Sequence, residues 1–294
     1  MLKRSIFIGN PARITTQYKQ LKIETEKRSA SIPIEDLGFL IIENQQVAIS
    51  IPAINKLNEQ NVALIFCNEK HMPSSMLLNL DAHYIQQEIF KFQIKASEPL
   101  KKQLWQQTIK KKILHQAELL ERQGKTQHPL RHYARKVTSG DTTNREAMAA
   151  AYYWKNLFDF PFVRERTGVF PNLFLNYGYA ILRAAVARAL AGSGLLNTLG
   201  IHHRNRYNAF ALADDIMEPF RPLVDAKVIE IMQKYSEEEL TTEIKAELIS
   251  ITTDTVYFDG YKSPLMVGLQ RVAGSLQQCF SGEKRKINYP NLWN

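Results

Sequence analysis

Short apolar runs dominate the first eighty positions of the chain and predict β-strands. Two of them, residues 37–42 and 62–67, are apolar over the length of a strand, which is typical of strands buried on both faces. Apolar residues at helical spacing between these runs predict one helix, over residues 51–61. Short stretches of apolar, Thr and Tyr residues, separated by polar residues or proline, predict four further strands: residues 5–8, 13–17, 21–24 and 29–33.

Beyond position 80 the apolar residues recur three and four positions apart, which predicts helices. Residues 98–123 have such a stripe, and much of the opposite face is basic. Residues 173–191 are apolar almost all round and are expected to form the central buried helix. Ser236 and Glu239 fit a capping box that would open the last of the remaining helices. These are predicted over residues 143–158, 213–235 and 237–250.

The change of pattern near position 80 predicts an α+β fold with two domains. A small, mostly β N-terminal domain is expected over residues 1–80, and a larger all-α C-terminal domain over residues 81–294. The composition, 45% hydrophobic and 23% charged, is that of an ordinary globular protein.

The cysteines and the apolar segments indicate the cellular compartment of the protein. Cys67 and Cys279 stand in unrelated contexts, which argues against a disulfide framework and against a thiolate zinc site. The apolar start ends at Gly9, too early for a signal peptide. Arg183 and Arg188 interrupt the most apolar segment, which argues against a membrane span. We therefore expect a cytoplasmic protein with no membrane association.

The net charge of +9 is concentrated in one tract. Residues 91–136 contain 12 basic and 3 acidic residues, whereas the rest of the chain has 26 of each. A solvated helix surface is the common explanation of a charge run. Because the whole net charge lies in one tract, binding to a nucleic acid, which releases counterions from the phosphates, becomes the favoured interpretation.

Two acidic residues near position 216 could bind a metal. Asp215 and Glu218 are three positions apart, so on a helix their carboxylates share a face. Carboxylate oxygens favour Mg²⁺ or Mn²⁺. Pro219 and Pro222 disfavour a regular helix and predict a bend beside the acidic pair. The alternative is a solvated acidic turn with Arg221 as the ion-pair partner.

Two further segments carry metal-competent side chains. The loop after Gly200 contains His202 and His203, of which only one is expected to face any single site. An imidazole is a possible metal ligand, although a lone histidine is more often structural. Glu146 opens a helix rich in small residues, but Thr143 and Glu146 also fit a capping box, and the pattern alone favours the cap.

Four segments follow one another along the chain: the Glu146 helix with Tyr-Tyr-Trp at 152–154, residues 175–183 (LNYGYAILR), residues 199–203 (LGIHH) and residues 215–225 (DIMEPFRPLVD). Taken in this order, they resemble the signatures of the CRISPR-associated protein one family, the integrase of spacer acquisition. The resemblance covers essentially the whole chain, including residues 33–38 (PIEDLG) and 287–290 (INYP). Each segment is weak evidence by itself, but the ordered set is highly specific.

The resemblance implies one divalent metal site, for Mg²⁺ or Mn²⁺, in the helical domain. The family's ligands and catalytic residues carry over as Glu146, His203 and Glu218, with Asp215 as a nearby acidic residue and no role given to His202. Many members have Asp where this chain has Glu218. That departure and the histidine doublet resemble the branch found in type II systems, and within it subtype II-C.

The resemblance also implies the reaction. The metal would polarise a phosphodiester of the repeat DNA and activate the 3′ hydroxyl of the incoming spacer, and water in place of that hydroxyl would give endonuclease activity. We expect Ala at any of the three ligand positions to abolish strand transfer while leaving the fold.

The partners implied are double-stranded DNA, as prespacer and repeat, and other subunits. The protein is expected to be a homodimer, two dimers of which flank one dimer of CRISPR-associated protein two; strand edges that need covering are a weak independent hint. Basic residues are the candidate contacts to the DNA backbone: Lys101, Lys102, Lys110, Lys111, Lys112, Arg131 and Arg135.

Two other functions fit parts of the pattern. A non-catalytic DNA-binding scaffold would keep the basic tract but use Glu146 as a helix cap and His203 in packing. A branched-DNA repair nuclease would share the metal chemistry without a role in immunity. Metal-dependent cleavage and strand transfer separate the first from an integrase, and a neighbouring CRISPR array separates the second.

Overall fold

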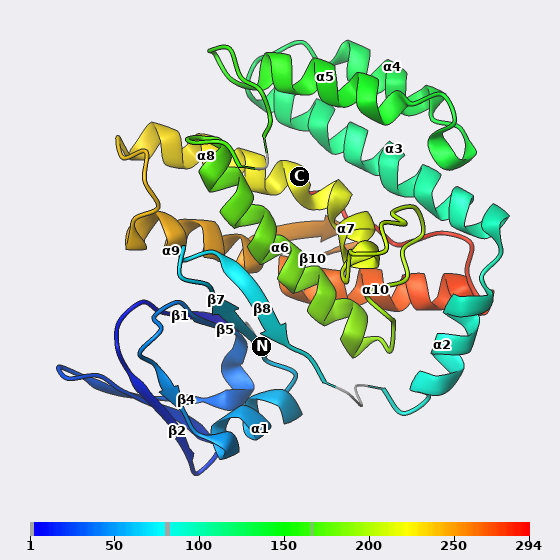
Figure 1. Ribbon diagram of the computed structural model, residues 1–294. Coiled ribbons are helices and arrows are strands. Elements are labelled where there is room, and N and C mark those ends of the chain that lie inside the picture. The colour runs from blue at the N-terminus through cyan, green and yellow to red at the C-terminus, as the bar shows by residue number, and fades with distance from the viewer. Residues whose placement is uncertain (1–2, 80–82, 166) are drawn as a thin grey trace.

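The computed structural model describes residues 3–79, 83–165 and 167–294, and has a β-rich N-terminal part and a larger helical part (Figure 1). One four-stranded sheet has the order β1-β5-β7-β8, in which β8 alone is antiparallel to its neighbour. A second sheet has the order β4-β3-β2-β6. The elements of this part are β1 (Arg4–Ile8), β2 (Arg13–Gln17), β3 (Gln20–Glu24), β4 (Ser29–Pro33), a 3₁₀ turn (Ile34–Asp36), β5 (Leu37–Ile42), β6 (Ala48–Ile49), α1 (Ile51–Glu59), β7 (Ala63–Cys67) and β8 (Pro73–Leu77).

The central strand β5 is buried at all six positions, as its continuous apolar run predicted. Phe39 and Ile41 belong to a core that continues into the helices. Leu40 and Ile42, on the opposite face, belong to a second core inside the β-rich part. Because side chains alternate along a strand, one sheet links both cores. The β-rich part therefore shares its core with the helical part, and the predicted boundary at residues 80 and 81 lies outside the described residues.

The helical part is built around α6, which contacts α7, α8, α9 and α10 and is buried along most of its length, as predicted (Figure 1). Helix α3 crosses the molecule beside α4 and α5. The helices are α2 (Gln86–Lys95), α3 (Glu98–Arg122), α4 (His128–Lys136), α5 (Arg145–Leu157), α6 (Asn172–Gly192), α7 (Ala211–Met217), α8 (Arg221–Lys234), α9 (Thr242–Ser250) and α10 (Leu265–Ser281). Within the described ranges of the chain, no helix is both long and apolar enough to cross a membrane.

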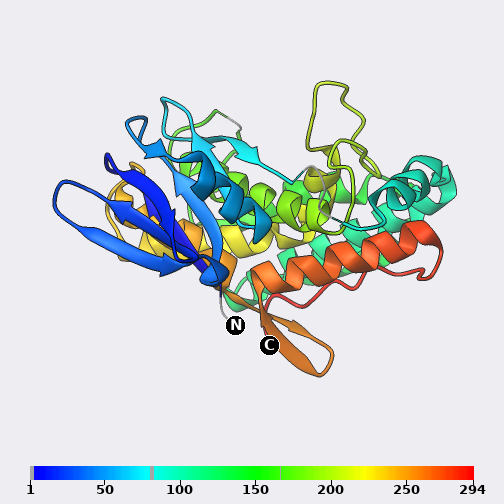
Figure 2. The same cartoon turned by 90° about the horizontal axis from the view of Figure 1, so that it is seen from below.

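A β-hairpin within the helical part was not predicted. Strands β9 (Thr255–Phe258) and β10 (Tyr261–Pro264) pair antiparallel and project from the molecule beside α10 (Figure 2). Their turn contains Asp259 and Gly260, and Gly260 has φ +82°, which glycine adopts without strain. Four-residue strands are too short to show a clear alternation, so the sequence pattern concealed them.

Two helix starts differ in an instructive way. The capping box of Ser236 and Glu239 is wrong, because α9 begins after Thr241, whose hydroxyl accepts a hydrogen bond from the Ile244 amide at 3.3 Å. The predicted helix over residues 213–235 is broken by a 3₁₀ turn, Glu218–Phe220. Pro219 and Pro222 each lie in the first turn of the segment they open, where a missing N–H costs little. The α-helix is therefore interrupted beside the acidic pair, where the prolines predicted an irregularity, and the bend itself stays a prediction.

Candidate metal centre

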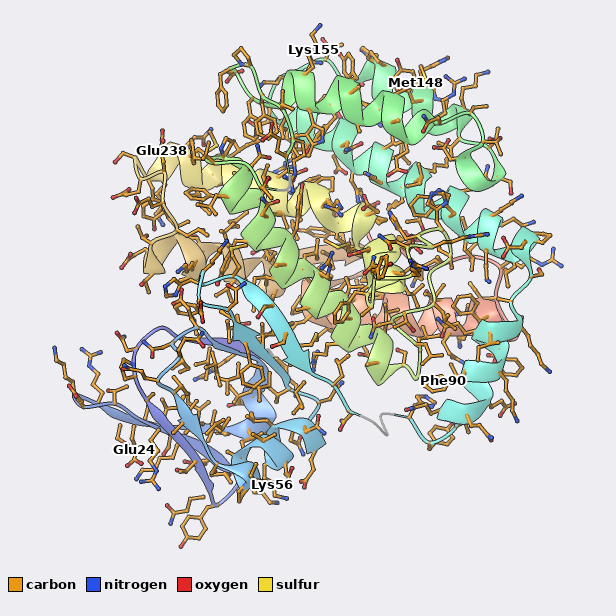
Figure 3. The ribbon with its side chains drawn as sticks, viewed as in Figure 1. Glu24, Lys56, Phe90, Met148, Lys155 and Glu238 are labelled. Atoms are coloured by element: carbon orange, nitrogen blue, oxygen red, sulfur yellow. The ribbon has the colours of Figure 1, made fainter. Side chains whose placement is uncertain are left out.

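Glu146 lies at the start of α5, and its side chain is available for chemistry. The carboxylate of Asp141 accepts hydrogen bonds from the amides of Arg145 and Glu146, both at 2.9 Å, and so satisfies the first turn of the helix. The proposed cap between Thr143 and Glu146 is therefore wrong. Glu146 points instead towards α3, where the Nζ of Lys112 donates to its Oε1 at 2.7 Å. The opposite side of α5 presents Met148 and Lys155 outward (Figure 3).

Glu218 lies in the 3₁₀ turn between α7 and α8 and is only 5% exposed. Its Oε1 accepts a hydrogen bond from the Nε of Arg221 at 2.8 Å, and its Oε2 lies 2.6 Å from the Nζ of Lys112. Burial alone would raise the pKa of Glu218, but the charges of Arg221 and Lys112 outweigh it and lower the pKa to about 2. The solvated acidic turn is therefore wrong, although Arg221 is indeed the partner.

Lys112 joins the two carboxylates. Its side chain comes from the middle of α3, is 8% exposed, and places one ammonium within ion-pair distance of both Glu146 and Glu218. Burial disfavours the charged ammonium, but Glu218 and Glu146 outweigh this effect and raise the pKa of Lys112. Because both contacts are made by the same nitrogen, the Oε1 of Glu146 and the Oε2 of Glu218 must lie close to each other. Two carboxylates from distant segments converge on one cation.

His203 is held by Asp215. The Asp215 carboxylate, which is fully buried, accepts from the amides of Ile201, His202 and His203 at 2.7, 3.0 and 3.2 Å and contacts the Nδ1 of His203 at 2.6 Å. The pKa of His203 is raised, and the hydrogen bond to Asp215 is the largest cause. Since an ionised carboxylate only accepts, Nδ1 carries the proton in the neutral imidazole and Nε2 keeps a free lone pair. Asp215 therefore orients a candidate ligand and fixes its loop.

The loop at residues 200–203 requires glycine at position 200, and it places the ring of His202 against Trp105. A Cβ at Gly200 would lie 2.7 Å from both the Asp215 Oδ2 and the carbonyl oxygen of His203, so a larger residue would displace the carboxylate. The ring of His202 stacks on Trp105, with centroids 4.0 Å apart and planes 2° apart. The rings of His202 and His203 are inclined by 81°, so the two histidines face different ways, as expected.

Two of the three candidate ligands, Glu218 and His203, line adjoining cavities, and Glu146 is joined to them through Lys112. Lys112 and Glu218 line a cavity of about 130 Å³, and His203 lines its neighbour of about 500 Å³. Both cavities share three wall residues, namely Arg164, Tyr179 and Arg221. Within residues 3–79, 83–165 and 167–294, no three His, Cys, Asp or Glu side chains are grouped closely enough to hold a metal as they stand. The glutamates meet at Lys112, and His203 faces the adjoining cavity.

The donor set nevertheless suits a hard divalent cation. The buried Oε2 of Glu218 lies 2.6 Å from the ammonium of Lys112 and has no hydrogen bond to any other described residue, so its partner is a cation. A buried carboxylate oxygen is costly unless a positive charge or a donor faces it. Two carboxylates and one oriented imidazole are ligands that Mg²⁺ and Mn²⁺ accept.

The sequence did not reveal a buried network behind this site. Asp225 accepts hydrogen bonds from the hydroxyl groups of Tyr153, at 2.6 Å, and Tyr179. Burial raises the pKa of Asp225 to about 6 despite these hydrogen bonds. The guanidinium groups of Arg164 and Arg221 lie over the Tyr179 ring, 5.2 and 4.5 Å from its centroid. Four of these five residues, all but Arg164, were inside the family signatures at 152–154, 175–183 and 215–225, and of them only Arg221 had been considered, as an ion-pair partner.

The candidate DNA contacts fall into three groups. Lys102, Lys110 and Arg135 are exposed. Others have partners: Lys101 lies 3.5 Å from Glu98, Lys111 donates to Asn291 at 2.6 Å, and Arg131 pairs with Glu121 at 2.7 Å. Lys112 is buried between the glutamates, so its place is in the candidate metal centre and not on the exposed basic surface.

Comparison with known proteins identifies the family of the chain and agrees with its fold. The family model described as CRISPR associated protein Cas1 matches residues 6–255. The CRISPR-associated endonuclease Cas1 of Neisseria meningitidis serogroup C is 39% identical over 97% of this chain and 95% of its own length. A casposase bound to its integration product has the same fold, with a TM-score of 0.75, 19% identity, and coverage of 98% of this chain and 93% of the casposase.

A further solved structure, titled as a Cas6-RT-Cas1–Cas2 complex, matches with a TM-score of 0.75 and 19% identity, over 99% of this chain and 36% of that longer chain. The family model covers well over half of the sequence, and the Neisseria relative is similar almost from end to end. The chain belongs to the Cas1 family of CRISPR-associated proteins.

Proposed function

We propose that this protein is a divalent-metal-dependent DNA endonuclease and integrase that joins the 3′ hydroxyl ends of a spacer to the CRISPR repeat. The observation that carries the proposal is the convergence of Glu146 and Glu218, from α5 and the 3₁₀ turn, on a single cationic position. The Neisseria relative is named an endonuclease, and the casposase of the same fold is bound to an integration product.

Each residue of the centre has a task in this proposal. Glu146, His203 and Glu218 would hold Mg²⁺ or Mn²⁺, which when bound supplies a Lewis acid for the phosphodiester and lowers the pKa of the attacking hydroxyl or water. Asp215 keeps the proton of His203 on Nδ1.

The cavity walls supply positive charge. Arg164 and Arg221 line both cavities, where their guanidinium groups would bind phosphate oxygens and stabilise the charge of an in-line displacement. With a DNA 3′ hydroxyl as nucleophile the product is an integrated strand, and with water it is a cleaved strand.

The proposal includes partners. We expect a homodimer, and we expect two such dimers to flank one dimer of CRISPR-associated protein two. In support, a chain of this fold occurs in a solved structure named as a Cas6-RT-Cas1–Cas2 complex. Exposed basic residues such as Lys102, Lys110 and Arg135 would contact the phosphate backbones of prespacer and repeat.

A strand-transfer assay with Mn²⁺, repeat DNA and the partner subunit tests the function. Glu146→Gln is the cleanest variant, because the amide oxygen can still accept from Lys112, and we expect it and His203→Gln to reduce integration to background while keeping the far-UV circular dichroism. Glu230→Gln, which removes only a surface ion pair on α8, is the matched control and should integrate normally. Normal integration by Glu146→Gln would refute the proposal, and a wild type without metal-dependent activity would indicate a DNA-binding scaffold.

A further inference from the structure

The buried ammonium of Lys112 stands where the two glutamates would bind a metal. Its Nζ is 2.7 Å from the Oε1 of Glu146 and 2.6 Å from the Oε2 of Glu218. Together with Arg221, which holds the other oxygen of Glu218, it balances the two negative charges of the pair. Side chains of the protein therefore neutralise both carboxylates.

A divalent ion cannot join this arrangement unchanged. A Mg²⁺ ion bound by the same oxygens would lie about 2.0–2.1 Å from them, in the space that the ammonium fills. Two cations in contact within a buried site repel strongly, since little solvent screens them. Binding of the metal by Glu146 and Glu218 therefore requires the ammonium of Lys112 to move.

The structure provides room and an acceptor for the displaced ammonium. Lys112 lines the cavity of about 130 Å³, and so does Gln116, one helical turn further along α3. The Oε1 of Gln116 is buried and, among the described residues, has no hydrogen-bond partner. Lys112 donates a hydrogen bond to Glu146 at 2.7 Å and forms an ion pair with Glu218 at 2.6 Å. A displaced ammonium gives up both contacts and needs an acceptor elsewhere.

We infer that Lys112 is an exchangeable counter-ion that closes the carboxylate pair in the metal-free protein and moves onto a DNA phosphate oxygen when the divalent ion binds. This inference rests on the proposed function, because it assumes that metal and DNA meet at this centre. Arg164 and Arg221 line the same cavity, so a phosphodiester drawn there by their charges would receive the ammonium. DNA and metal then bind cooperatively, since each favours the displaced position of Lys112.

The test is the affinity for Mn²⁺, measured from the electron paramagnetic resonance signal of the free ion, with and without a short DNA duplex carrying 3′ overhangs. We expect the duplex to raise the affinity of the wild type about tenfold. Lys112→Met should bind Mn²⁺ about tenfold more tightly than the wild type without DNA, and the duplex should add little. Lys234→Met, which removes a surface lysine paired with Glu247, is the control and should behave as the wild type.

A second variant guards against a folding defect. Lys112→Gln keeps a hydrogen-bond donor without the charge and should show the same gain in Mn²⁺ affinity. Both variants should melt below the wild type in EDTA and gain more from Mn²⁺ than the wild type does. If the wild type binds Mn²⁺ and both variants bind it equally or more weakly, the inference fails while the proposed function stands. If neither wild type nor variants bind Mn²⁺ with or without DNA, both fail.

Discussion

Asp215 lies in α7 and Glu218, three residues further on, opens the 3₁₀ turn that follows, and both are buried carboxylates. The charge of Asp215 is surrounded by N–H groups of the loop at residues 201–203. The charge of Glu218 is instead surrounded by two side-chain cations, Lys112 and Arg221.

Backbone amides cannot move away from the Asp215 carboxylate without unfolding the loop, so Asp215 fixes the conformation of residues 201–203. A lysine ammonium can leave, so the Glu218 side can exchange one cation for another. The comparison teaches that the partners of a buried carboxylate, rather than its burial, separate a positioning residue from a metal ligand.

The largest expected effect comes from Glu218→Gln. Loss of the charge removes a metal ligand and leaves Lys112 and Arg221 without their shared partner, so integration should fall by at least about 1,000-fold, as for other groups that stabilise transition-state charge. Unfolding in urea should show a loss of about 3–5 kcal/mol, typical of a broken buried pair. Integration within tenfold of the wild type would mean that Glu218 is not a ligand.

A smaller effect is expected from Asp215→Asn. The amide can donate to Nδ1 of His203, which would shift the proton to Nε2 and remove the free lone pair, and partners of this kind alter metal affinity or activity by about 10–100-fold. The ¹⁵N shifts of the His203 ring report the tautomer directly. Asp159→Asn, at a highly exposed position, is the control. An unchanged tautomer with full activity would contradict the positioning role.

The pH dependence of stability separates two buried carboxylates. The pKa of Glu218, about 2, is below its usual 4.5, so its stabilisation is present above pH 4.5 and is lost as the pH falls towards 2. The pKa of Asp225, about 6, is above its usual 3.8, so the folded state loses stability as the pH rises from about 4 to about 6.

The variant Asp225→Asn should cancel only the second trend. The amide oxygen can still accept from Tyr153 or Tyr179, so the variant should gain roughly 2–3 kcal/mol relative to the wild type between pH 4 and pH 7, as a pKa difference of about two units implies. Urea unfolding in EDTA at the two pH values measures this difference. Parallel stability profiles for wild type and variant would show that Asp225 does not titrate in this range.

The smallest effect concerns a solvated charge. Lys110→Gln should weaken DNA binding a few-fold and reduce the slope of log affinity against log salt by about one. Lys56→Gln provides the matched change on α1, where the lysine pairs with Glu59 at the surface of the β-rich part (Figure 3). Identical salt slopes for the two variants would show that Lys110 does not contact DNA and that the basic tract is an ordinary solvated surface.

Local patterns in the sequence predicted what depends on local physics. Burial of β5 and α6 followed from apolar runs, and the break after Met217 followed from Pro219 and Pro222. The assignment of Glu146, His203 and Glu218 as ligands came from the family resemblance and stays a proposal.

The role of Lys112 could not be predicted, because its partners are 34 and 106 positions away in the sequence. The basic tract even concealed it, although the helical spacing of Lys112 from Thr108, Ile109 and Gln116 places it on the buried face of α3, unlike Lys110. The Asp141 cap was missed for a different reason: Thr143 offered a familiar motif two residues later.

Diffraction from crystals grown with Mn²⁺ and a DNA end tests the central claim most directly, because the anomalous signal locates the ion. The account predicts one peak within ligand distance of Glu146, His203 and Glu218, with the Lys112 ammonium moved from between the glutamates to a phosphate oxygen. A DNA-bound structure in which Lys112 still bridges the two glutamates, with the manganese elsewhere or absent, would contradict it.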